Sequence, residues 1–181
     1  MKVTETKLPS VVIIEPQRFG DERGFFLESW NARTFDEHGL SHDFVQDNHS
    51  RSAKGVLRGL HFQKQNPQGK LVRVTRGRAF DVAIDIRPDS QHYREWVGIE
   101  LSEASPAMFY IPEGFAHGFL SLEDGTDFLY KCTTFYDPAD EGCIVWNDPE
   151  IGIDWPLDGI EPIVSAKDAA APTLAQYRAE D

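Results

Sequence analysis

The chain has little of several features that would define its class. It contains only two cysteines among 181 residues, which is too few for the disulfide framework of a small secreted protein. Its N-terminus has no apolar stretch of the signal-peptide kind, and no uninterrupted apolar run approaches membrane-spanning length. We therefore expect a reducing, cytoplasmic location and no membrane partner.

Basic residues are also scarce. Lys and Arg number 18 against 30 Asp and Glu, which gives a net charge of -12 and an isoelectric point near 4.9. This balance disfavours nonspecific binding to nucleic acid or to anionic membranes. An anionic ligand would need a local basic pocket on this acidic protein.

Helical periodicity is almost absent, and short runs of β-type residues alternate with turns that contain Gly and Pro. The pattern predicts an all-β antiparallel sandwich or barrel in a single domain, residues 1–181. Short helices are expected only at 31–38 and within 166–178, where Pro172 would interrupt the second. The expected strands cover residues 11–14, 25–30, 44–49, 56–63, 71–75, 79–86, 96–101, 107–111, 118–122, 127–135 and 143–146.

The expected strand at residues 79–86 alternates apolar and acidic side chains. Asp81 and Asp85 share one face. The opposite face carries Phe80, Val82, Ile84 and Ile86. This alternation predicts a half-buried strand.

Three cationic or titratable side chains interrupt the apolar stretch 56–74. They are Arg58, His61 and Lys70, and each alone could lie on a solvated sheet face or, for the histidine, be a satisfied core imidazole. Strict alternation would place Arg58 and His61 on opposite faces of a strand. They share a site only if Gly59 allows a bulge or bend.

A second polar cluster occupies residues 111–119. Pro112 and Gly114 predict a tight turn that delivers His117 into the following strand. The spacing Pro-x-Gly-x-x-His resembles the second half of the cupin signature. The fold expected from it is a jelly roll.

Cupins often bind a metal through histidines of both half-motifs and a carboxylate. The first half-motif would be His61-Phe62-Gln63, in which the expected second histidine is Gln63. Lys70 would further repel a divalent ion. We therefore expect no metal.

Without a metal, His61 and His117 suggest a general base and a polar contact. Asp168 could accept the other imidazole N–H of the base, or it could cap the alanine-rich stretch that follows. Tyr130 could simply pack in the core; directed into a cavity opposite a histidine, it becomes a candidate acid.

Eight stretches together resemble the dTDP-4-dehydrorhamnose 3,5-epimerase family, in register from about Val11 to Pro172. They are residues 19–29, 46–50, 56–63, 69–73, 111–119, 128–131, 146–149 and 165–172. The resemblance implies a metal-free cupin jelly roll without a cofactor. It also implies inversion at C3 and C5 of a 4-keto-6-deoxy sugar carried on dTDP, through enolate intermediates.

By this resemblance, His61 is the base, Asp168 completes a His–Asp dyad, Tyr130 is the acid, and Lys70 lies near O4, where enolate charge accumulates. Further substrate contacts are implied for Arg23, Glu28, Gln46, Asp47, Asn48, Arg58, His117, Glu141 and Lys167, with Phe19, Phe26 and Tyr136 as candidates for stacking on thymine. The family also implies a homodimer that exchanges N-terminal strands, so that Arg23 and Glu28 would reach the partner's pocket.

The sequence leaves other functions open. Related sequences include epimerases that act at C3 or C5 only and ketoisomerases of dTDP-4-keto sugars. A sugar-nucleotide-binding cupin without catalysis and a metal-dependent cupin oxygenase are alternatives of other classes.

Overall fold

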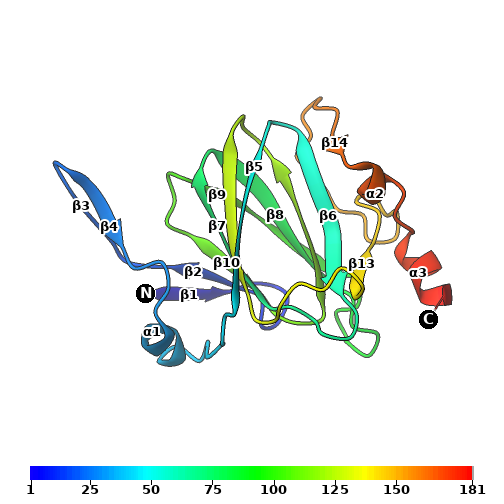
Figure 1. Ribbon diagram of the computed structural model, residues 1–181, viewed down its shortest axis with the longest axis horizontal. Coiled ribbons are helices and arrows are strands. Elements are labelled where there is room, and N and C mark those ends of the chain that lie inside the picture. The colour runs from blue at the N-terminus through cyan, green and yellow to red at the C-terminus, as the bar shows by residue number, and fades with distance from the viewer. Residues whose placement is uncertain (181) are drawn as a thin grey trace.

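A computed structural model describes residues 1–180, and most of its strands build two facing β-sheets (Figure 1). The first sheet has the order β1 (Lys2–Glu5), β2 (Val12–Glu15), β10 (Met108–Ile111), β7 (Lys70–Arg76), β12 (Thr126–Cys132) and β5 (Gln46–Ser52). The second has the order β13 (Glu141–Cys143), β6 (Val56–Gln63), β11 (Phe115–Ser121), β8 (Arg78–Asp85) and β9 (Trp96–Ser102), with β14 (Ile163–Val164) parallel to β6. The expected antiparallel jelly roll is confirmed.

The helices are short and lie outside the sheets. α1 (Ala32–Asp36) follows Asn31, whose side chain accepts hydrogen bonds from two backbone N–H groups of the first turn. α2 (Ala166–Ala169) and α3 (Leu174–Glu180) flank Pro172, as expected. Within residues 1–180, no helix combines the length and the apolar character that crossing a bilayer requires.

Two predicted strands end earlier than expected. β4 (Gly24–Leu27) pairs only with β3 (Arg18–Asp21), and this hairpin extends away from both sheets (Figure 1). β12 ends at Cys132, and the chain beyond it bonds to other segments. The Thr133 hydroxyl accepts from the Gly69 N–H, and the Tyr136 N–H donates to the side chain of Gln46 on β5. The last predicted strand shifts to 141–143.

Apolar side chains form cores on both faces of the second sheet. Val72, Phe109, Phe119 and Phe128 belong to the core between the sheets. A second core lies on the outer face of the second sheet, which the C-terminal segment covers. It includes Val82, Ile84, Leu120, Ile144, Trp155 and Leu174. Each such side chain contributes about 1.5–3 kcal/mol when fully buried, so the C-terminal segment is an integral layer of the fold.

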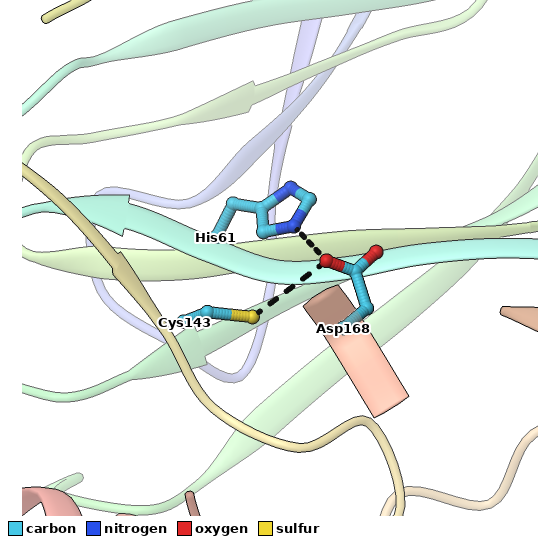
Figure 2. A group of neighbouring side chains, drawn as sticks. All are labelled: His61, Cys143 and Asp168. Carbon is cyan, nitrogen blue, oxygen red and sulfur yellow. Dashed lines mark hydrogen bonds and ion pairs between the residues drawn. The ribbon is translucent and has the colours of Figure 1, made fainter. Parts of the chain in front are cut away.

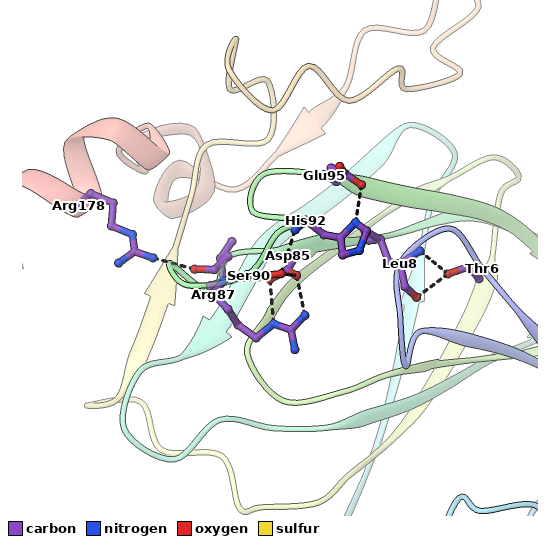
Figure 3. Close-up of polar contacts among 9 residues, drawn as sticks. Thr6, Leu8, Asp85, Arg87, Ser90, His92, Glu95 and Arg178 are labelled. Atoms are coloured by element: carbon purple, nitrogen blue, oxygen red, sulfur yellow. Dashed lines mark hydrogen bonds and ion pairs between the residues drawn. The ribbon is translucent and has the colours of Figure 1, made fainter.

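The prediction that β8 is half-buried is wrong, because both of its faces are covered. Asp81 and Asp85 are fully buried and face the interior between the sheets, while the apolar face packs under the C-terminal segment. Figure 3 shows the Asp85 carboxylate accepting hydrogen bonds from Arg87 Nε at 2.9 Å and Ser90 Oγ at 2.6 Å. Burial opposes ionisation, but these hydrogen bonds hold the pKa of Asp85 below its usual value.

β6 departs from regular pairing at Gly59, as its sequence suggests. Gly59 has φ +124°, and the register with β11 shifts between the His117–His61 and Phe119–Arg58 pairs. A Cβ at this position would lie 2.6 Å from Gly118 Cα, which is closer than packed atoms approach. This irregularity allows Arg58 and His61 to line the same cavity.

We expect Gly59→Ala to destabilise the protein by about 2–4 kcal/mol, since both backbone strain and a backbone clash oppose it. Urea unfolding would measure the change. Gly39→Ala is the matched control: Gly39 also has positive φ, +75°, but a Cβ there meets nothing within 4 Å, so it should cost only about 1 kcal/mol. Equal losses would contradict the clash.

Candidate active site

A cavity of about 350 Å³ opens between the two sheets. Side chains reach it from both sides, which is why residues far apart in the sequence meet there. The first sheet contributes Gln46, Asn48, Ser50, Lys70 and Tyr130. The second contributes Arg58, His61, Phe62, Gln63, His117, Phe119 and Glu141, and loops add Gln68 and Tyr136.

His61 pairs with Asp168 at the wall of this cavity, and Figure 2 shows the two side chains facing each other. The imidazole is partly exposed, with 32% of its side-chain surface accessible. Its Nε2 lies 2.8 Å from Asp168 Oδ1, and the N–H of Gly59 donates to Oδ2 at 3.3 Å. The aspartate is 4% exposed. An Nε2–H that donates to the carboxylate leaves Nδ1 of His61 with the lone pair that can accept a proton.

Asp168 is positioned by the start of α2. Ser165, not Asp168, caps this helix: its hydroxyl accepts from the Asp168 N–H at 3.1 Å. The carboxylate is therefore available to His61. Burial opposes its ionisation, but the hydrogen bonds from His61 and Gly59 hold the pKa of Asp168 below its usual value.

A second histidine–aspartate pair lies deeper between the sheets. His117 Nε2 is 2.7 Å from Asp81 Oδ1, and the aspartate is fully buried. Burial lowers the pKa of His117, with Asp81 acting in the opposite direction, so the imidazole is neutral near pH 7. Asp81 was not among the predicted site residues, although a carboxylate in a strand of Val and Ile was a usable signal.

Lys70 and Tyr130 are the groups that the first sheet contributes to the expected chemistry. Lys70 is 7% exposed, and its ammonium donates to the His61 carbonyl at 3.4 Å. Burial lowers the pKa of Lys70. Burial also raises the pKa of the Tyr130 phenol, so Tyr130 keeps its proton at neutral pH.

A hydrogen-bonded chain forms the rim. Gln46 accepts from the Tyr136 N–H at 2.8 Å, and the Tyr136 hydroxyl donates to Glu141 at 2.9 Å. Lys167 pairs with the same Glu141 carboxylate. Asn48 lies next to Gln46, whose amide donates to it at 3.0 Å.

Several predicted substrate contacts lie outside this cavity. Phe19, Arg23 and Phe26 are on the projecting β3–β4 hairpin, where Arg23 pairs with Asp21. Glu28 follows the hairpin and accepts hydrogen bonds from the start of α1. Asp47 alternates with Gln46 and Asn48 on β5, and its carboxylate binds Lys131 at 2.9 Å.

Gln63 occupies the position where a cupin of the metal-binding kind would have its second histidine. Both ends of its amide are engaged by loop backbone: Nε2 donates to the Asn66 carbonyl at 2.7 Å, and Oε1 accepts from the Asp137 N–H at 2.8 Å. His117 is likewise engaged by Asp81. These side chains therefore have structural partners of their own.

The Asp168 carboxylate makes the free energy of unfolding depend on pH in the acidic range. Its pKa is lower in the folded state than the ordinary value of about 3.9, so its contribution is present at neutral pH and is lost as pH falls through the folded pKa. We expect the unfolding free energy of the wild type to fall more steeply below about pH 5 than that of Asp168→Asn. Urea unfolding at several pH values tests this, with the exposed Asp89→Asn as control. Parallel curves for wild type and Asp168→Asn would refute it.

Comparison with known proteins identifies the family. The model of the dTDP-4-dehydrorhamnose 3,5-epimerase family matches residues 5–176. The dTDP-4-dehydrorhamnose 3,5-epimerases of Salmonella typhimurium and Methanothermobacter thermautotrophicus are 56% identical over 178 residues and 54% identical over 165 residues. The alignments cover 97% of both chains for the first, and 91% of this chain and 89% of the relative for the second.

A solved structure gives the same result. The crystal structure of dTDP-6-deoxy-D-glucose-3,5-epimerase from Legionella pneumophila, in complex with dTDP-4-keto-L-rhamnose, is 51% identical in sequence. It matches with a TM-score of 0.95, covering 99% of this chain and 95% of that chain. The chain therefore belongs to the dTDP-4-dehydrorhamnose 3,5-epimerase family, the cupin-type isomerases that its sequence resembles.

Proposed function

We propose that His61, Asp168, Lys70 and Tyr130 carry out the conversion of dTDP-4-dehydro-6-deoxy-D-glucose to dTDP-4-dehydro-L-rhamnose. The observation that supports these roles is the placement of His61 and Tyr130 in one cavity, on opposite sheets. A sugar ring bound between the sheets would present one face to each of them. The family relationship supports the reaction itself.

The base acts at carbons that the ketone has made acidic. C3 and C5 both flank the C4 carbonyl, so loss of either C–H proton gives an enolate. His61 accepts the proton at Nδ1, and Asp168 stabilises the imidazolium through Nε2–H. The same base can serve both carbons in turn.

Inversion requires that the new proton arrive on the opposite face. Tyr130 retains its phenolic proton at neutral pH because burial raises its pKa, and it delivers this proton from the first sheet. Removal and return of a proton change no oxidation state at carbon. Acid and base side chains are therefore sufficient, and we propose no cofactor.

Negative charge develops on O4 in each enolate. Lys70, buried beside the dyad, supplies a preorganised positive charge at that oxygen in a site with little water. His117, whose Nε2–H donates to Asp81, can accept a further hydrogen bond from a sugar hydroxyl at Nδ1. Such groups lower the barrier more than they tighten ground-state binding.

The nucleotide would lie toward the rim. Arg58 is exposed at the cavity wall and Lys167 at its edge, so both can meet pyrophosphate on a protein whose net charge is -12. Tyr136 is 49% exposed, with a ring face open to a thymine. Gln46 and Asn48 would complete the polar contacts.

We expect Tyr130→Phe to reduce net epimerisation by about 10²–10⁴-fold, the usual worth of a general acid, while His61 still exchanges substrate protons with solvent. NMR in heavy water, coupled to a downstream reductase, would then show deuterium entering without inversion. His61→Asn should abolish both exchange and inversion. In the double epimerase, exchange occurs at C3 and at C5.

The control for Tyr130 is Tyr93→Phe, which removes a phenol that does not line the cavity. Full activity of Tyr130→Phe would disprove its role as the acid. Exchange at only one carbon in the wild type would instead identify a mono-epimerase.

The proposal extends to a homodimer built from single-domain chains. Three phenylalanines of the β3–β4 hairpin are strongly exposed: Phe19 is 55%, Phe25 58% and Phe26 69% exposed. An isolated two-stranded hairpin with such a surface is stable when it packs on another surface. We infer that the hairpin reaches the partner's cavity and brings Phe19, Arg23 and Phe26 to the substrate, with Glu28 close behind.

Mixed dimers test this exchange. The Arg23→Ala and His61→Asn chains should each be weakly active or inactive alone. When they are unfolded and refolded together, half of the dimers are mixed, and each mixed dimer has one intact site of two. The mixture should therefore recover about one quarter of wild-type activity. Sedimentation would confirm the dimer. Activity that stays at the level of the separate variants would contradict the exchange.

A reducing, cytoplasmic compartment is also part of this proposal. Cys132 and Cys143 are both free thiols. Unpaired thiols are typical of proteins kept in such a compartment.

A further inference from the structure

Cys143 lies beside the catalytic pair, on the side of His61 that faces Asp168 (Figure 2). Its Sγ is 3.9 Å from Asp168 Oδ1, the same oxygen that lies 2.8 Å from His61 Nε2. The three potential donor atoms all lie within 4.8 Å of one another. β13 supplies the thiol, β6 the imidazole and α2 the carboxylate.

The donor set suits a thiophilic divalent cation. One imidazole nitrogen, one thiolate sulfur and one carboxylate oxygen are the ligand types of zinc, whereas Mg²⁺ and Ca²⁺ favour oxygen alone. Tetrahedral zinc with ordinary bond lengths separates such donors by about 3.3–3.6 Å. The His61–Asp168 distance would open by about half an ångström, and the thiol would move closer.

Charge also balances at this position. A thiolate and a carboxylate together neutralise a divalent cation, and the neutral imidazole adds no charge. Asp168 is 4% exposed, so a neutral cluster is far easier to accommodate there than an uncompensated ion. The ammonium of Lys167 is paired with Glu141.

A second cavity of about 320 Å³ borders the cluster. It is lined by His61, Asp168 and Ser165, by the cations Arg58 and Lys167, and by apolar residues of β6 and β14. His61 lines both cavities. His61 thus lies at the boundary of the two cavities, and an ion that enters the second one passes Arg58 and Lys167, of which Lys167 is paired with Glu141.

We propose that His61, Cys143 and Asp168 form an inhibitory site for a zinc-class cation. The cation bonds to Sγ, whose proton leaves to solvent, to a carboxylate oxygen and to Nε2, whose proton is replaced by one on Nδ1; water fills the fourth position. With Nδ1 protonated, the imidazole has no lone pair for the substrate proton. The inhibitory half of this proposal rests on the role of His61 proposed above.

Cobalt(II) is the probe of binding, because a thiolate–cobalt bond gives a charge-transfer absorption band independent of catalysis. Wild type should bind one cobalt per chain with this band. Cys143→Ala should lose the band, and Cys132→Ala, the same change at the buried cysteine outside the cluster, should keep it. Absence of the band in the wild type, or its persistence in Cys143→Ala, would overturn the site.

Zinc is the probe of inhibition. It should suppress epimerisation by wild type and Cys132→Ala, with recovery on adding a chelator, and its apparent inhibition constant should rise about tenfold or more in Cys143→Ala. Equal inhibition of both variants would place the inhibitory metal elsewhere. If cobalt gives the thiolate band but saturating zinc leaves turnover unchanged, the metal site stands and its inhibitory action fails. The role of His61 is judged separately, because full activity of metal-free His61→Asn would remove it, whereas loss of exchange and turnover in that variant would keep it. Circular dichroism would confirm that both variants fold.

Discussion

The hydrogen bond between His61 and Asp168 is the interaction on which the site depends. It joins residues 107 positions apart in the sequence, one on a central strand and the other on a helix that packs outside the sheet. It can form only when the second sheet and the C-terminal layer are both in place. The geometry of the base is therefore a product of the whole fold rather than of one loop.

The interior between the sheets is divided by polarity. One part is a close-packed apolar core that includes the stacked rings of Phe119 and Phe128, with centroids 3.9 Å apart. The other contains Lys70, Asp81 and His117, each less than a tenth exposed. Burying such groups is costly unless they are paired. The histidine–aspartate pairs offset part of that cost, and the Lys70 ammonium donates to the His61 carbonyl.

The sequence predicted much of this arrangement because the relevant signals are local. Turn-separated β-type runs indicated the jelly roll, Pro172 the break between the last two helices, and Gly59 the irregularity that brings Arg58 and His61 together. Alternation failed at β8, because it distinguishes two faces but does not say which is solvated. Asp81 was thus assigned to a half-exposed face, although it is buried against His117.

Other features could not be seen from local pattern at all. The proximity of Cys143 to Asp168 depends on how β13 and α2 meet beside β6. In the dimer proposed above, the positions of Phe19, Arg23 and Phe26 would depend on a second chain, since their hairpin extends away from both sheets (Figure 1). No periodicity within one chain encodes either relationship.

The C-terminal layer has a consequence for how the enzyme folds during its synthesis on the ribosome. Strands β1 to β13 emerge before the segment that covers the second sheet, and Asp168 belongs to that last segment. On the roles proposed above, a nascent chain that stops short of Asp168 would lack the anchor of its imidazole and part of the apolar cover of the second sheet, so it would be catalytically silent.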